Sequence, residues 1–168
     1  YWGEAHYHSF YTNDQVEFGA PLKAAVAIGK ALGLNWLAVT DHSYDLDDLY
    51  NNFLVRDPQL TKWEDLKREI KELNQQEEKF VIVLGEEVSC RNEDDQNIHL
   101  LAFFIDRFYP GQGDSAEHWF KRYSEYSAKE ITHQIKNTAG ISFAAHPGKR
   151  ISWLQRLFLK RGNWSIKD

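Results

Sequence analysis

The run FVIVLGEEVS, residues 80–89, decides the fold class. Its first half, Phe80 to Leu84, is a short continuous apolar run of the kind seen in strands that are buried on both faces. Gly85, Glu86 and Glu87 follow at once, so the strand is expected to end in carboxylates. If the segment stays extended, neighbouring side chains point to opposite faces, and Glu86 and Glu87 therefore point away from one another.

Four further segments on either side of this run have the pattern of strands, and helical patterns alternate with them. The expected strands cover residues 2–8, 35–40, 98–105 and 141–145, and the expected helices cover 21–32, 61–76 and 114–137. Asp114 or Ser115 is the expected cap of the last helix, and residues 44–59 are expected to be an irregular insertion. Alternating strands and helices predict one α/β domain over residues 1–168, built around a mainly parallel sheet or barrel.

Metal-ligating residue types stand at or just beyond the C-terminal ends of four of the five expected strands. They are His6, His8, Asp41, His42, Glu87 and His146, whereas His99 stands at the start of its strand. In parallel α/β architectures, functional sites assemble at the C-terminal edge, because loops converge there while the strands stay rigid. We therefore expect these side chains to converge.

The spacing of these residues indicates cation binding. His6 and His8 are two residues apart, so both project from the same face of a strand and can hold one ion. Glu87 is a carboxylate and can bridge two cations, which an imidazole cannot do. Each residue also has an ordinary alternative when it is taken singly: a chance pair of histidines, a solvated acid, or an exposed or core histidine at His42 or His146.

Five motifs, taken together and in order, resemble the polymerase and histidinol phosphatase (PHP) family. They are GEAHYHS (3–9), AVTDHS (38–43), LGEEVS (84–89), IHLLAFF (98–104) and AAHPG (144–148), and they extend over nearly the whole chain. The resemblance implies a distorted (β/α)7 TIM-like barrel of the PHP type, with two or three divalent ions at the C-terminal edge of its strands. It also implies a metal-dependent phosphoesterase.

The resemblance further implies a role for each candidate ligand. His6 and His8 would hold one ion, and Glu87 would bridge it to a second ion held by His99 and His146. His42 would hold a third ion with a side chain from the loop after the first strand. The catalytic residues would be Glu87, His6 and His8.

This sequence departs from the family pattern in two places. The loop after the first strand reads Thr12-Asn13-Asp14-Gln15, so Asp14 is the best candidate for the remaining ligand, and Asn13 is the alternative. The family's closing Asp-x-His motif is absent, and the resemblance places it several strands after His146. We therefore expect residues 1–168 to be a C-terminally truncated PHP barrel.

The implied chemistry is hydrolysis of a small phosphomonoester. Paired cations lower the pKa of a water between them and neutralise charge on a phosphoryl group. His and carboxylate ligands suit Zn, Mn or Fe better than Mg or Ca. Lys149 and Arg150 follow His146 and are candidates to hold the substrate phosphate, although a solvated helix start is the ordinary alternative. The rival functions are a metal-dependent nuclease and a non-catalytic metal-binding module of a larger protein.

Composition narrows the classes of partner. The net charge is −5, yet residues 149–168 hold six Lys or Arg against only Asp168, so the body of the chain is acidic. An acidic body makes nucleic acid a possible but not a favoured partner, because phosphate neutralisation needs clustered cations.

No apolar run approaches the roughly 18 residues that span a bilayer, so no membrane is expected. Cys90 is the only cysteine, which excludes an internal disulfide and favours the cytoplasm.

Overall fold

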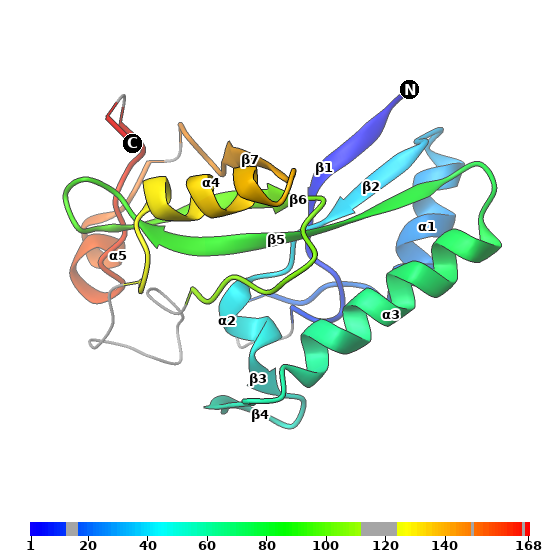
Figure 1. Cartoon of the computed structure of the whole chain (residues 1–168), viewed down its shortest axis with the longest axis horizontal. Helices are drawn as coiled ribbons and strands as arrows, with labels where there is room; N and C mark the ends of the chain where they lie inside the picture. The colour runs from blue at the N-terminus through cyan, green and yellow to red at the C-terminus, as the bar shows by residue number, and fades with distance from the viewer. Residues whose placement is uncertain (13–16, 112–123, 149, 166) are drawn as a thin grey trace.

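A computed structural model describes residues 1–12, 17–111, 124–148, 150–165 and 167–168 of the chain. Five strands form one curled, mixed sheet in the order β1-β2-β5-β6-β7 (Figure 1). Their bounds are Gly3–Tyr7 (β1), Trp36–Val39 (β2), Val81–Arg91 (β5), Asn97–Phe103 (β6) and Ile141–Ala144 (β7). β1, β2 and the first part of β5 pair in parallel, whereas β6 runs antiparallel to both β5 and β7. A separate two-stranded ribbon joins β3 (Asp48–Leu49) to β4 (Asn52–Arg56).

The expected (β/α)7 TIM-like barrel is wrong. Such a barrel needs parallel strands joined by helices, whereas this five-stranded sheet has two antiparallel pairings. The difference arises in β5, which was expected to end in Gly85, Glu86 and Glu87. Val88 and Cys90 continue the alternation of buried apolar side chains beyond Gly85, so the strand continues and residues 85–91 pair with 97–103 of β6.

The turn between β5 and β6 is built by the side chain of Asn92. Its Oδ1 accepts hydrogen bonds from the backbone N–H groups of Asp94 (3.0 Å) and Gln96 (2.8 Å), a local pattern by which asparagine reverses a chain. Because β6 is antiparallel to its neighbours, it begins on the same side of the sheet where the parallel strands end. His99, near the start of β6, is thereby brought to that edge.

The bounds of the helices are Leu22–Ala31 (α1), Ser43–Leu46 (α2), Thr61–Gln76 (α3), Ala128–Asn137 (α4) and Trp153–Phe158 (α5). Two of the three predicted helices lie close to their predicted bounds, whereas α2 and α5 were not predicted, and residues 44–59 hold part of α2 and the β3–β4 ribbon instead of an irregular insertion. The helix expected over residues 114–137 is shorter at its start: residues 112–123 lie outside the described residues, and 124–127 are not helical. Ser127 instead caps α4, forming a capping box with Glu130. None of the described helices is long and apolar enough to cross a membrane.

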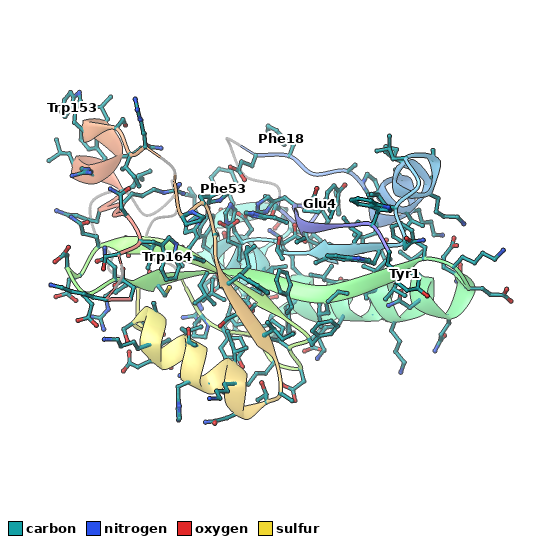
Figure 2. The ribbon with its side chains drawn as sticks, turned by 90° about the horizontal axis from the view of Figure 1, so that it is seen from above. Tyr1, Glu4, Phe18, Phe53, Trp153 and Trp164 are labelled. Carbon is teal, nitrogen blue, oxygen red and sulfur yellow. The ribbon has the colours of Figure 1, made fainter. Side chains whose placement is uncertain are left out.

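The two faces of the sheet differ in what covers them. Even-numbered side chains of β5 and β6, such as Val88 and Leu100, belong to the main core together with α1, α3 and α4. Val83 and Leu101, which are odd-numbered, belong to a small apolar cluster on the opposite face. Figure 2 shows β5 running across the molecule, with α4 on one side of the sheet. Because side chains alternate along a strand, Glu87 and His99 share the face of the small cluster.

Candidate metal centre

Glu87 is a fully buried carboxylate on β5, and three imidazoles face its Oε2 atom. The distances from Oε2 are 2.8 Å to His6 Nε2, 3.1 Å to His8 Nε2 and 3.4 Å to His42 Nδ1. The Nε2 atoms of His6 and His8 are themselves 3.1 Å apart, as their spacing on the first strand predicts. Three side chains from two neighbouring strand ends therefore meet at one carboxylate oxygen.

The other oxygen of Glu87 faces two more imidazoles. Oε1 lies 2.5 Å from His99 Nδ1 and 3.1 Å from His146 Nε2. His99 stands opposite Ser89 in the β5–β6 ladder, so it is the diagonal neighbour of Glu87 on the same face. The structure thus gathers around Glu87 all five histidines that the sequence analysis assigned to the site.

His146 reaches the cluster through an unusual backbone conformation. Its φ of 48° lies in the left-handed region, which non-glycine residues adopt at a cost and which concentrates at functional sites. The preceding residue, Ala145, donates its N–H to the carbonyl of His99 over 2.9 Å, so the end of β7 is tied to β6. The left-handed turn then carries the imidazole toward Glu87.

Asp41 fixes the loop that carries His8. Its carboxylate is buried and accepts hydrogen bonds from the backbone N–H (2.6 Å) and the hydroxyl (2.5 Å) of Ser9. Thr12 Oγ1 lies 3.4 Å from His8 Nδ1, on the side of the ring away from Glu87. Contacts of this kind orient imidazole ligands, because a partner on one ring nitrogen fixes the direction of the other.

Glu17 is a candidate ligand that the sequence analysis missed. Its Oε2 lies 3.2 Å from His42 Nε2, and this contact lowers the pKa of Glu17 to about 2. His8, Glu17 and His42 form one of three groups whose ligand atoms lie within 4.8 Å of one another. Asp14, the sequence-based candidate, lies outside the described residues. The only feature of the sequence that could have indicated Glu17 is its acidic side chain in the same loop, three positions after Asp14.

Glu86 points to the opposite side of the sheet from Glu87, as expected for an extended segment. Its Oε1 accepts a hydrogen bond from Ser43 Oγ over 2.7 Å, and its Oε2 accepts one from the backbone N–H of Tyr109 over 3.1 Å. Burial raises the pKa of Glu86 well above its ordinary value. Both glutamates are buried, but only Glu87 faces the histidines.

The pKa shifts of the cluster keep Glu87 charged but differ between its histidines. Burial alone would raise the pKa of Glu87, but attraction to His42 and His99 holds that pKa well below its ordinary value. Burial lowers the pKa of His42, which favours the neutral imidazole. Burial would also lower the pKa of His8, but the contact with Glu87 instead raises it, so an ion held by His8 would have to displace a ring proton.

The donor set fits divalent ions. The three groups that could hold an ion are His6-His8-Glu87, His8-Glu17-His42 and His42-Glu87-His99. His42 Nδ1 is buried with no hydrogen-bond partner among the described residues, although it lies 3.4 Å from Glu87 Oε2. Ligand atoms about 2.1 Å from a tetrahedral ion are roughly 3.4 Å apart, which is near the 3.4 Å between His42 Nδ1 and Glu87 Oε2. An ion between these atoms would supply the missing partner.

The cluster lines a cavity of about 250 Å³ that is open to solvent. Its walls are the five histidines, Glu17, Glu87 and one cation, Arg161. Arg150, a predicted substrate-binding residue, instead lines a neighbouring depression with Arg156, and Lys149 lies outside the described residues. Whether either of the two predicted cations contacts a substrate stays a prediction.

No protein-family model matches this chain, and no curated protein matches it. The geometry around Glu87 is therefore the observation on which a function can be proposed.

Glu17→Gln tests the ligand that the structure adds. Removing the charge of Glu17 should weaken binding of one ion by about tenfold or more, because carboxylate ligation needs the anion. Titration of the metal-stripped protein with Zn²⁺ would show one site lost and the sites around Glu87 kept. Asp14→Asn, in the same loop, tests the candidate that the sequence analysis names, and a larger loss with Glu17→Gln than with Asp14→Asn is expected if Glu17 is the ligand. A loss with Asp14→Asn and none with Glu17→Gln would reverse the assignment.

Proposed function

We propose that this protein is a metal-dependent phosphoesterase that hydrolyses a small phosphomonoester through two or three divalent ions. The observation that carries the proposal is the ring of five imidazoles around the buried carboxylate of Glu87. We also propose that the chain is a divergent member of the PHP family. The support is that four of the five family-like motifs supply the imidazoles of the ring and the fifth, LGEEVS, supplies Glu87.

The residues around Glu87 would hold the ions in overlapping groups. His6, His8 and His42 face Oε2 of Glu87, and His99 faces Oε1, so Glu87 would bridge two ions. Zn, Mn or Fe suits this mixture of nitrogen and carboxylate oxygen. Such ions, when bound, neutralise charge on a phosphoryl group and lower the pKa of a bound water.

The chain's own contribution is to hold the ligands in place and to shield Glu87 from bulk water. Glu87 is fully buried and keeps its negative charge, whereas His6 and His8 are partly exposed at the mouth of the cavity. Asp41 holds the loop behind His8, and the carbonyl of His99 anchors Ala145, the residue directly before His146. Ligands held from several strands keep the site rigid while the side facing solvent stays open to substrate.

An assay on two model esters tests this function. Protein reconstituted with Mn²⁺ or Zn²⁺ is incubated with p-nitrophenyl phosphate, a monoester, and with bis(p-nitrophenyl) phosphate, a diester. We expect the monoester to be hydrolysed faster, and chelation of the ions to stop turnover. Re-addition of Mn²⁺ or Zn²⁺ should restore it.

Other outcomes of this assay would contradict the proposal. A preference for the diester, or cleavage of a single-stranded oligonucleotide, would favour a nuclease. Metal-loaded protein that is folded and hydrolyses neither ester would favour a non-catalytic metal-binding module. His133→Ala removes an exposed imidazole on α4, outside the cluster, and controls for metal bound by surface histidines.

A further inference from the structure

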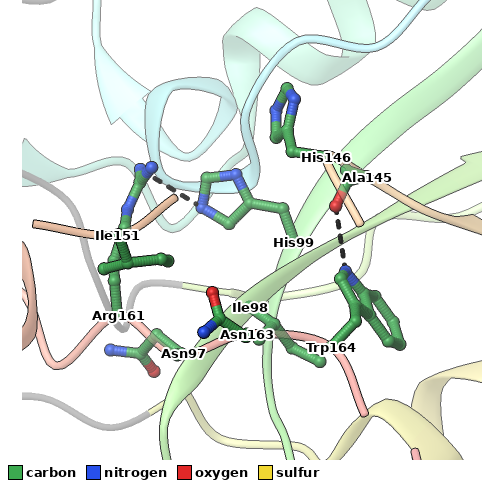
Figure 3. Close-up of a pocket in the computed structure, with 10 residues that line it drawn as sticks. Asn97, Ile98, His99, Ala145, His146, Ile151, Arg161, Asn163 and Trp164 are labelled. Atoms are coloured by element: carbon green, nitrogen blue, oxygen red, sulfur yellow. Dashed lines mark hydrogen bonds between the residues drawn. The ribbon is translucent and has the colours of Figure 1, made fainter. Parts of the chain in front are cut away.

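Arg161 is the one Lys or Arg in the described part of the chain that lines the cavity of the metal centre. One of its guanidinium nitrogens lies 3.5 Å from His99 Nε2 (Figure 3). It also lines an adjoining pocket with Asn97, Ile151 and Trp164. Arg161 therefore stands where the histidine cluster opens into a second pocket, a position that neither metal ligation nor core packing requires.

The backbone around Arg161 is held on both sides. The N–H of Asn97 donates to the carbonyl of Lys160, and the N–H of Gly162 donates to the carbonyl of Asn97, each over 2.8 Å. A Cβ on Gly162 would lie 2.5 Å from Gln96 Cβ, so only glycine allows this approach to β6. The segment that carries Arg161 is thus hydrogen-bonded to β6, the strand that carries His99. This pairing positions the guanidinium beside His99.

A second anchor holds the segment that follows. The indole N–H of Trp164 donates to the carbonyl of Ala145 over 2.9 Å, directly before His146 (Figure 3). Residues 160–164 therefore contact β6, which carries His99, and the residue that precedes His146. His99 and His146 are the two histidines that face Glu87 Oε1. A cation fixed in this way needs little reorganisation to meet a ligand in the cavity.

The hydrogen bond between Arg161 and His99 depends on which ring nitrogen of His99 carries the hydrogen, and therefore on whether His99 binds an ion. Arginine can only donate, so in the contact with Arg161 the Nε2 atom of His99 accepts, and the ring hydrogen lies on Nδ1, toward Glu87. An ion held through Nδ1 requires the ring hydrogen to be on Nε2, which can then no longer accept from Arg161. If His99 held an ion through Nδ1, the guanidinium of Arg161 would have to donate to another acceptor in the cavity.

We propose that Arg161 is the anion-recognition residue of this site and binds the non-bridging oxygens of a terminal phosphate group. This inference rests on the proposed function and deepens it by naming the substrate group. A planar guanidinium pairs with two phosphate oxygens at once, which favours a dianionic monoester with exposed oxygens over a diester. Ion loading and phosphate binding should then support one another.

Isothermal titration with inorganic phosphate tests the proposal without relying on turnover. The compared proteins are wild type, Arg161→Gln and Arg161→Lys, each loaded with Zn²⁺ or Mn²⁺, with bound metal measured in parallel. We expect Arg161→Gln to weaken phosphate binding by about tenfold to a hundredfold at full metal content, and Arg161→Lys to restore part of the affinity. Wild type stripped of metal should bind phosphate more weakly than loaded wild type.

Lys160→Gln is the matched control, because it removes an equal charge from the neighbouring exposed side chain and should leave phosphate affinity unchanged. Unaltered phosphate affinity in fully loaded Arg161→Gln would overturn the inference. So would loss of metal from that variant, which would make Arg161 a support for His99, and so would a loaded wild type that does not bind phosphate. Wild type that binds phosphate through Arg161 but hydrolyses no ester would leave this inference standing and defeat the proposed function.

Discussion

Replacing Glu87 by Gln is expected to lower phosphomonoester turnover by about a hundredfold or more, since each tenfold loss needs only about 1.36 kcal/mol. The substitution keeps the size of the side chain but removes the charge that two of the three ligand groups share. The amide of Gln would also place an N–H group toward the imidazoles, at the position where Glu87 offers a carboxylate oxygen to an ion. Turnover of p-nitrophenyl phosphate, measured with Mn²⁺ or Zn²⁺ in excess, separates a catalytic loss from weaker metal binding.

Glu86→Gln is the control on the same strand. Burial raises the pKa of Glu86 well above its ordinary value, so the neutral amide resembles the side chain that the fold already holds. The Gln oxygen can accept from the N–H of Tyr109, and its amide can donate to Ser43 Oγ. The cost to turnover should be about tenfold or less. Near wild-type turnover in Glu87→Gln, or a greater loss in Glu86→Gln, would contradict the assignment of Glu87 as the bridge.

Replacing His42 by Ala is expected to have the next largest effect, a loss of turnover of about tenfold to a hundredfold. His42 belongs to two of the three ligand groups, and its two ring nitrogens face Glu17 and Glu87. One substitution therefore weakens ion binding on both sides of the imidazole. Turnover and bound metal should fall together in the variant.

Folding has to be checked for this variant, because His42 is buried and its ring stacks on Tyr44 at a centroid distance of 4.6 Å. His42→Gln fills more of the space and serves as a second variant, and thermal unfolding monitored by circular dichroism shows whether each protein is folded. A folded His42 variant with wild-type metal content and turnover would remove His42 from the centre.

The sequence predicted local elements well and the sheet topology poorly. Thr61–Gln76 forms the helix that its apolar periodicity indicates, and the expected strand that ends before His146 is present as β7. The antiparallel pairing of β5 with β6 was missed because Gly85, Glu86 and Glu87 were interpreted as the end of a strand. The local sequence indicated that the strand ends at Gly85 to Glu87, but pairing with β6 extends it, because residues 85–91 form an antiparallel ladder with β6.

The convergence of the candidate side chains was easier to predict than the fold, and the topology shows why. A pair of histidines two residues apart, and acids or histidines after apolar runs, need only strand alternation to reach one edge of a sheet. That condition also holds in a mixed sheet, because antiparallel β6 starts at the edge where β1 and β2 end. Glu17 and Arg161 lie in irregular segments without periodicity, so their approach to the cluster could only be seen in three dimensions.

Counting the ions bound per chain tests the central claim most directly. Wild-type protein is stripped with a chelator, reconstituted with Zn²⁺ or Mn²⁺, dialysed against metal-free buffer and measured by inductively coupled plasma mass spectrometry beside Glu87→Gln. We expect about two or three ions per wild-type chain and a clear deficit in the variant. Folded wild-type protein that retains no ion, or Glu87→Gln that retains as many as wild type, would contradict a metal centre organised by Glu87.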